Sequence, residues 1–141
     1  MPNGTDKPIG YWVRSLDGLL ETLLDRDLAD MGVGRRHWQL LNTLQAGPLE
    51  EGALAERLRP FWREGAITLA EVIGDLTERG WLEPDGAGRH RLTAGGRAAH
   101  ARLAERIAAT RRHLAEGVTA EEYAVTVDVL RRMTANARAR L

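Results

Sequence analysis

The sequence has no cysteine, a single serine and no glycine-rich loop that ends in Gly-Lys-Ser or Gly-Lys-Thr. Without cysteine there is no disulfide framework, no thiolate metal ligand and no cysteine nucleophile. Ser15, the only serine, lies inside the apolar stripe of a predicted helix, and the four histidines show no HxxxH or HExxH spacing. We therefore expect no catalytic residue, no metal site and no cofactor, and predict that the protein is not an enzyme.

Long apolar runs are also missing, because no stretch of 18 apolar residues occurs. The N-terminus, MPNGTDKP, lacks the charged-then-apolar pattern of a signal peptide. These features predict a soluble cytoplasmic protein with no membrane partner. With 141 residues, of which 43% are apolar, the chain can bury one core. We expect residues 1–8 to be a flexible N-terminus.

Net charge is absent as well, since 20 basic residues balance 20 acidic ones. Residues 1–34 hold three bases and six acids (−3), residues 35–97 hold nine of each (0), and residues 98–141 hold eight bases and five acids (+3). A domain that only grips DNA normally carries a basic face. Charge alone therefore does not identify nucleic acid as a partner.

Three helices are predicted in the first 60 residues. The first spans Ile9 to Asp30, where apolar residues recur at helical spacing, and Met31 to Gly34 interrupts it. A second helix spans His37 to Gln45 and ends before Gly47-Pro48, which cannot continue it. A third, short helix is predicted from Leu49 to Leu58.

The stretch Ile67 to Arg97 changes its hydrophobic period twice. A helix beginning at Leu69 is stopped by Gly80, and two short strands then flank a turn at residues 84–88. Thr93 can cap the next helix with its hydroxyl. Helix, hairpin and helix in this order predict a winged helix-turn-helix.

The carboxyl end is predicted to form two more helices. One follows Arg97, and Thr119-Ala-Glu-Glu122 is a capping box that begins the other. A terminal helix with an apolar face has little core left to cover in so small a domain, so a partner subunit is expected to cover it. The alternative is that this helix folds back on its own chain. The apolar residues of the last helix are Tyr123, Val127, Leu130 and Met133.

Four segments in this order, RRHWQLLNTL, LAERL, LTERGWLE and RLTAGGR, resemble the MarR family of winged-helix transcriptional regulators. The resemblance implies a mainly α fold with a small β-hairpin wing. Its domains would be an N-terminal dimerisation helix (residues 9–34), a winged helix-turn-helix module (35–96) and C-terminal dimerisation helices (97–141). It further implies a homodimer that binds a pseudo-palindromic operator in double-stranded DNA, as a repressor released by a small aromatic effector.

In the resembling family the helix before the wing, here the helix that begins at Leu69, is the recognition helix that contacts DNA. DNA-binding residues are therefore predicted around this helix and on the wing. Facing away from the apolar stripe, Glu71 could accept a hydrogen bond from cytosine, although Glu71, Asp75 and Glu78 together make this face acidic. The turn before the helix, Arg59 to Ala66, is longer than the family's usual turn. The alternative to DNA contact is that the polar face of this helix is only solvated and that the wing arginines only keep an edge strand soluble. The predicted DNA-binding residues are Arg63, Thr68, Glu71, Arg89 and Arg91.

Aromatic residues on the first two predicted helices suggest an effector site. Tyr11, Trp12, His37 and Trp38 combine apolar walls with polar groups, as a pocket for a small aromatic molecule requires. Alternatively, each is a core residue. The first helix is also expected to contribute to the dimer through Ile9 and Leu16. The runner-up function is a winged-helix dimer that has lost operator binding and serves as a small-molecule- or protein-binding module.

Overall fold

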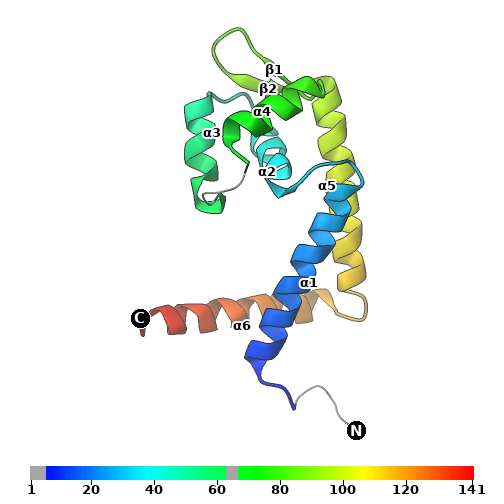
Figure 1. Ribbon diagram of the computed structural model, residues 1–141. Coiled ribbons are helices and arrows are strands. Elements are labelled where there is room, and N and C mark those ends of the chain that lie inside the picture. The colour runs from blue at the N-terminus through cyan, green and yellow to red at the C-terminus, as the bar shows by residue number, and fades with distance from the viewer. Residues whose placement is uncertain (1–5, 63–66) are drawn as a thin grey trace. The chain divides into compact units, whose positions relative to one another are not determined.

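The computed structural model describes residues 6–62 and 67–141 and confirms a mainly helical winged-helix fold (Figure 1). The chain divides into two compact units, Met1–Ile107 and Ala108–Leu141. In chain order the elements are α1 (Ile9–Ala29), α2 (Arg35–Leu44), α3 (Glu51–Leu58), the short 3-10 helix η1 (Arg59–Phe61), α4 (Leu69–Glu78), β1 (Leu82–Pro84), β2 (His90–Leu92), α5 (Ala94–Leu114) and α6 (Ala120–Arg138).

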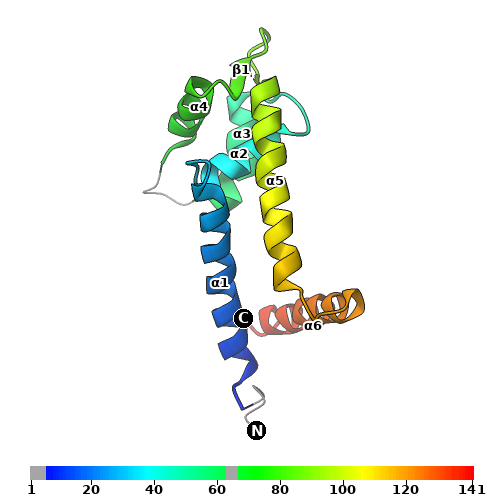
Figure 2. The ribbon, with the colours of Figure 1, turned by 90° about the vertical axis from the view of Figure 1, so that its right-hand side faces the viewer.

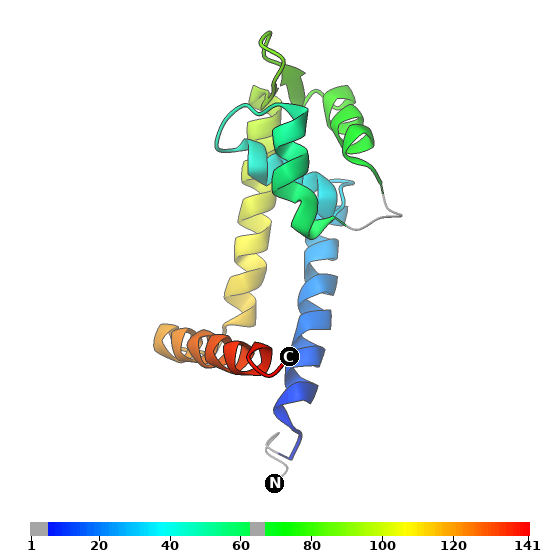
Figure 3. The same ribbon diagram turned by 90° about the vertical axis from the view of Figure 1, so that its left-hand side faces the viewer.

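Helix α2 lies at the centre of the first unit, where it packs against α1, α3, α4 and β2. The wing and helices α2 to α4 gather at the end of this unit that is opposite the N-terminus of α1 (Figures 2 and 3). One apolar cluster joins all these elements. Its fully buried members are Leu28, Leu40, Leu41, Leu54, Val72, Leu76, Leu82 and Leu103.

Helix α1 ends at Ala29, one residue before the predicted end at Asp30, and α2 begins two residues earlier than expected, at Arg35. Gly32 adopts a φ of 68°, which reverses the chain after α1. The imidazole of His37 reaches back so that its Nδ1 accepts a hydrogen bond from the backbone N–H of Gly34 (3.4 Å). This contact satisfies one of the free amides at the start of α2, which explains the earlier beginning.

Leu49 was predicted to begin α3, and this is wrong, because α3 begins at Glu51. The backbone of Leu49 instead pairs with His90 of β2, donating to its carbonyl (3.0 Å) and accepting from its N–H (2.8 Å). Both backbone groups of His90 thereby gain partners that the two-stranded hairpin leaves open. The end of β2 next to the wing turn is thus tied to the loop between α2 and α3.

The hairpin is antiparallel, with Leu82 opposite Leu92 and Pro84 opposite His90. The predicted cap at Thr93 is confirmed, since its hydroxyl accepts from the backbone N–H of Gly96 (3.0 Å) and donates to the carbonyl of Gly80 (2.5 Å). α5 begins at Ala94.

The second unit consists of the end of α5 and the helix α6. The predicted capping box is confirmed: Thr119 Oγ1 accepts from the N–H of Glu122 (3.0 Å), and the Glu122 carboxylate accepts from the N–H of Thr119 (2.9 Å). The hydrogen bond from the backbone N–H of Thr119, with the nearby Thr119 side chain, holds the pKa of the Glu122 carboxyl below its ordinary value. No helix within the described ranges is long and apolar enough to cross a membrane.

Candidate nucleic-acid interface

The recognition helix α4 lies on the core through one apolar face. Val72, Ile73 and Leu76 are buried, whereas Gly74 and Glu78 lie on the exposed side. In a helix-turn-helix, the exposed side of this helix enters the major groove. The geometry of its polar residues therefore determines what could reach a base.

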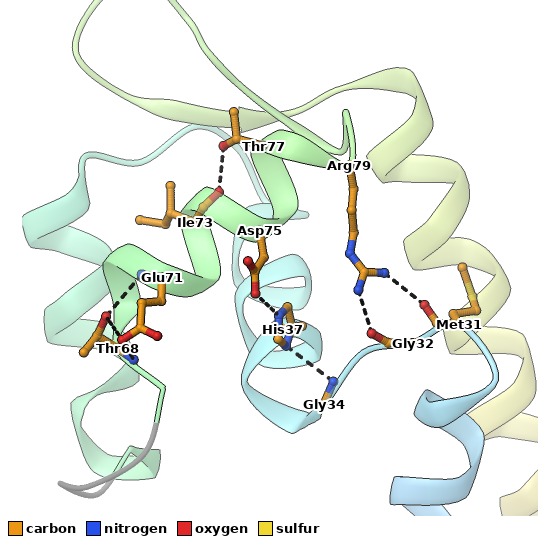
Figure 4. Close-up of polar contacts among 10 residues, drawn as sticks. All are labelled: Met31, Gly32, Gly34, His37, Thr68, Glu71, Ile73, Asp75, Thr77 and Arg79. Carbon is orange, nitrogen blue, oxygen red and sulfur yellow. Dashed lines mark hydrogen bonds and ion pairs between the residues drawn. The ribbon is translucent and has the colours of Figure 1, made fainter.

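The first turn of α4 is closed by a second capping box, formed by two residues that were predicted to face DNA. Thr68 Oγ1 accepts from the backbone N–H of Glu71 (3.2 Å). Glu71 Oε1 in turn accepts from the hydroxyl of Thr68 (3.0 Å) and from its backbone N–H (3.4 Å), as Figure 4 shows. One carboxylate oxygen of Glu71 is thus occupied by the cap, which stabilises the helix start.

Asp75 lies on the exposed side of α4, as expected, and its carboxylate also reaches α2. Its Oδ2 lies 3.3 Å from Nε2 of His37, which was predicted as an effector residue (Figure 4). Two of the three recognition-helix acids, Glu71 and Asp75, therefore have partners within the protein, and Glu78 stays exposed. Neither partner carries a permanent positive charge, so the exposed side of α4 remains acidic.

One turn beyond Asp75, the guanidinium of Arg79 reaches the loop after α1. Its Nη1 donates to the carbonyl of Met31 (3.0 Å) and its Nη2 to the carbonyl of Gly32 (2.6 Å). The same guanidinium lies 5.2 Å from the ring centre of Trp81, the residue before β1. Arg79 therefore connects α4, the wing and the end of α1.

The turn before α4 is anchored on α2 at both ends. Trp62 Nε1 donates to Oε1 of Gln39 (2.6 Å), and the guanidinium of Arg36 lies 4.8 Å from the Trp62 ring centre. Arg36 also donates to the carbonyl of Ile67. Trp62 is partly buried and packs against the core. Arg63, a predicted phosphate contact, lies outside the described residues.

The wing turn is organised by Asp85, whose carboxylate is almost covered. Its Oδ1 accepts from the backbone N–H groups of Ala87 (2.8 Å) and Arg89 (3.1 Å), and its Oδ2 accepts from Nε of Arg89 (2.6 Å). These bonds, that of Ala87 foremost, hold the pKa of Asp85 below its ordinary value. The wing tip is thus a closed, hydrogen-bonded turn.

Both predicted wing arginines are about half exposed and paired with a carboxylate. Arg89 pairs with Asp85, and Arg91 Nε donates to Oε1 of Glu83 across the hairpin (3.0 Å). The Arg91–Glu83 pair is exposed on both sides and contributes about 0–1 kcal/mol, so a phosphate can replace Glu83 at little cost, whereas Asp85 is covered and Arg89 offers the exposed half of its side chain. The pairs hold the arginines on the wing without preventing contact with DNA.

The four predicted effector residues lie in two separate places. Trp38 stacks on His100 of α5 with ring centres 5.0 Å apart, and it lies beside His37 at the start of α2. Tyr11 and Trp12 contact each other edge-to-face near the N-terminus of α1, whereas α2 follows the C-terminus of α1. The 16 residues from Trp12 to Leu28 span about 24 Å of helix, so the structure does not join the four into one pocket.

The residues predicted for dimerisation are exposed in the single chain. Ile9 and Leu16 lie on α1, which has one buried residue, Leu28. Among the described residues of α6 none is buried, and Tyr123 and Val127 are 57% and 50% exposed. Leu130 and Met133 are exposed on the same helix.

Several contacts were not predicted because no local pattern indicates them. Arg36 and Gln39 on α2, and Arg79 at the end of α4, bind partners 23 to 48 residues away in sequence. His100 was noted only as a histidine outside any motif, whereas it stacks on Trp38 and lies 3.1 Å from Oδ1 of Asn42. Only the Thr68-x-x-Glu71 box had a sequence signal that was overlooked.

Comparison with known proteins identifies the domain. Residues 33–96 match the family model described as a winged helix DNA-binding domain. No curated protein matches the sequence.

Solved structures resemble nearly the whole chain. The PcaV transcriptional regulator of Streptomyces coelicolor is 28% identical, with a TM-score of 0.73 over 94% of this chain and 99% of that one. A MarR family protein of Mycobacterium tuberculosis in complex with DNA is 21% identical (TM-score 0.70; 90% and 98% covered). The reduced form of MarR from E. coli is also 21% identical (TM-score 0.69; 90% and 93% covered). Of these neighbours PcaV is named as a transcriptional regulator, in line with the prediction that the chain is not an enzyme.

Proposed function

Because the chain has the fold of the MarR-family transcriptional regulators and carries a winged helix DNA-binding domain at residues 33–96, we propose that it is a homodimeric repressor that binds a pseudo-palindromic operator. The observation that carries the proposal is the exposed side of α4 next to a wing with two exposed arginines. A two-fold dimer would set the two recognition helices about 34 Å apart, one turn of DNA.

In this proposal α4 lies in the major groove with its N-terminal turn toward the bases. The small residues Ala70 and Gly74 on its exposed side permit close approach, and Glu71 has a second carboxylate oxygen with which to accept from cytosine. Arg89 and Arg91 would bind phosphate or enter the minor groove. Thr68 contributes by holding the helix start, and Arg63 remains proposed as a phosphate contact.

The proposed dimer is supported by the apolar side chains left uncovered on α1 and α6. Monomeric proteins rarely expose such contiguous apolar surface. On α6, Tyr123, Val127, Leu130 and Met133 fall on one broad stripe at helical spacing. A second copy of the chain is the proposed cover for this stripe and for Ile9 and Leu16 of α1.

Release by a small aromatic effector is proposed at α2. Trp38 offers a half-buried aromatic surface beside His37, and His37 contacts Asp75 of the recognition helix. A ligand that moved His37 would therefore act on α4 directly. Tyr11 and Trp12 are too distant to share this site and are assigned instead to the proposed dimer surface.

The alternative is a winged-helix dimer that no longer binds an operator and serves as a small-molecule- or protein-binding module. The observation that favours it is that both exposed wing arginines already have carboxylate partners, in a chain with no net positive charge.

One experiment separates the two functions. Genomic fragments bound by the full-length protein are selected, and the affinity of the enriched duplex is measured over a range of salt concentrations. A regulator should bind it with an affinity that falls steeply as salt rises, because binding releases counterions from the phosphates. If no fragment is enriched at low salt while sedimentation shows an intact dimer, the repressor is excluded and the alternative stands.

A further inference from the structure

We infer that Arg79 is a positioning residue for DNA binding, which fixes the recognition helix to the loop between α1 and α2 (residues 30–34, the junction loop). The inference rests on the proposed function. It concerns the angle at which α4 is presented and assigns Arg79 no contact with DNA.

The geometry is that of a fork on two consecutive carbonyls. Arg79 directs Nη1 to the carbonyl of Met31 (3.0 Å) and Nη2 to that of Gly32 (2.6 Å), as Figure 4 shows. Only the planar guanidinium of arginine can donate to two oxygens in this way, since a lysine ammonium is a point charge on a flexible stem. The two hydrogen bonds thus fix both the distance between α4 and the junction loop and the direction in which Arg79 approaches the loop.

The position and conformation of the junction loop favour binding of the Arg79 guanidinium. It directly follows the C-terminus of α1, where unpaired carbonyls and the helix dipole favour a positive charge. The φ of 68° at Gly32 turns the chain there, and a Cβ at this position would lie 3.7 Å from Nη2 of Arg79. Leu28 and Val33, on either side, are buried in the core, so the loop is a firm support.

A second contact one turn earlier completes the attachment. Asp75 and Arg79 are four residues apart, hence on one side of α4, and Asp75 lies 3.3 Å from Nε2 of His37. Arg79 also lies over Trp81, whose backbone carbonyl accepts from the N–H of Thr93 at the end of the wing. The end of α1, the recognition helix and the wing therefore meet at one guanidinium.

This arrangement links subunit contact to DNA reading. α1 carries exposed apolar residues that we assign to the dimer, and its C-terminal end is bound to α4 through Arg79. A rotation of α1 would thus be passed to the recognition helix. A phosphate-binding residue would instead point its donors outward, whereas both terminal nitrogens of Arg79 donate inward.

The test compares Arg79→Lys with Arg102→Lys, a control at an exposed position of α5. Both variants keep the charge, so a general electrostatic effect is held constant. Affinity is measured for two duplexes of about 30 base pairs, three turns of DNA: one selected by the wild-type protein from a random library, and the unselected pool. Amide hydrogen exchange is followed in the same variants without DNA.

For Arg79→Lys we expect about a tenfold loss of affinity for the selected duplex, as for the loss of one charge-assisted hydrogen bond. Affinity for the unselected pool and the slope of affinity against salt should be unchanged, because phosphate contacts are untouched. Exchange should become faster in residues 29–34 and 75–81. Arg102→Lys should alter none of these.

Three results would overturn the positioning role: an unchanged affinity for the selected duplex, an equal loss on both duplexes with a shallower salt slope, or unchanged exchange in both segments. The exchange measurement needs no DNA, so it keeps this failure apart from that of the proposed function. The latter fails if the wild-type protein selects no duplex.

Discussion

The backbone carbonyl of Trp81 occupies the place where a side chain on Gly96 would stand, since a Cβ there would lie 2.1 Å from that oxygen. Only glycine allows the start of α5 to approach the wing this closely.

Gly96→Ala should destabilise the protein by about 1–3 kcal/mol or more through overpacking, measured by chemical denaturation. Gly95→Ala is the matched control. A Cβ at Gly95 meets only ordinary contacts, and alanine favours a helix by up to about 1 kcal/mol. Equal losses in the two variants would contradict the steric argument.

Arg89→Ala should weaken binding to all duplexes alike. Because we propose a phosphate contact for Arg89, its loss should lower the slope of log affinity against log salt by about 1 for each protomer. Arg91→Ala should behave in the same way, and Arg102→Ala, which removes a charge on α5 instead, should leave the slope in place. Electrophoretic or fluorescence titrations at several salt concentrations give the answer. An unchanged slope for both wing variants removes the wing from the mechanism.

Glu78→Gln should raise the affinity for DNA. A carboxylate ~7 Å from a phosphate at an effective dielectric of ~40 is repelled by roughly 1 kcal/mol, which corresponds to about a fivefold change. Glu71→Gln should instead lower the affinity for the selected duplex, because glutamine can keep the cap with its oxygen but then turns an NH2 donor, in place of the second carboxylate oxygen, toward cytosine. Both are measured on selected and unselected duplexes. A loss confined to the selected duplex would mean that the replaced carboxylate reads a base.

Val127→Glu should convert the proposed dimer to monomers, detected by sedimentation velocity. The added carboxylate would lie in the middle of the apolar stripe on α6, where it would have to be buried without a partner. Ala135→Glu places the same charge outside the stripe, about 135° around the helix from its centre, and should leave the dimer intact. The stripe is not the subunit contact if both variants sediment as the wild-type protein does.

Stability should fall as the pH is lowered through the titration of His100. Burial lowers the pKa of His100 in the folded protein, whereas the unfolded chain binds its proton near the ordinary value of about 6.5. Between the two values the unfolded state binds more protons, so the free energy of unfolding rises with pH there.

Urea denaturation at pH values of about 7.5 and 5.5, on either side of the ordinary histidine pKa, should therefore show a larger difference for the wild type than for His100→Gln. The variant His113→Gln serves as a control at an exposed position of α5. An identical pH dependence for the wild type and His100→Gln would refute this account.

Local sequence patterns were sufficient for most of the fold. The helical stripe of α4, the stop at Gly80 and the Thr93 cap are each set by residues close together in the chain, and the structure confirms them. The predicted start of α3 was wrong because the backbone of Leu49 pairs with that of His90, 41 residues later. This pairing overrides the helical pattern at Leu49.

The candidate site was less accessible to sequence reasoning. Helical periodicity correctly put Glu71 and Asp75 away from the core, but periodicity does not say what a polar side chain binds. The partner of Glu71 is local, at Thr68, and could have been found. The partner of Asp75 lies at the start of α2, and those of Arg79 lie in the loop after α1. Both are more than 35 residues earlier in the sequence, and only the fold brings them together.

The pairing of Leu49 with His90 supports the hairpin next to its turn, at the end of β2 that is farther from α5. This support comes from a segment outside the hairpin, while the turn itself is closed by the bonds of Asp85 to Ala87 and Arg89. Gly86 and Gly88 have positive φ, so a side chain at either position would strain this turn. Replacing the whole turn leaves the Leu49–His90 pairing in place. If the chain binds DNA as proposed, longer and more basic turns grafted between β1 and β2 should therefore alter its DNA preference.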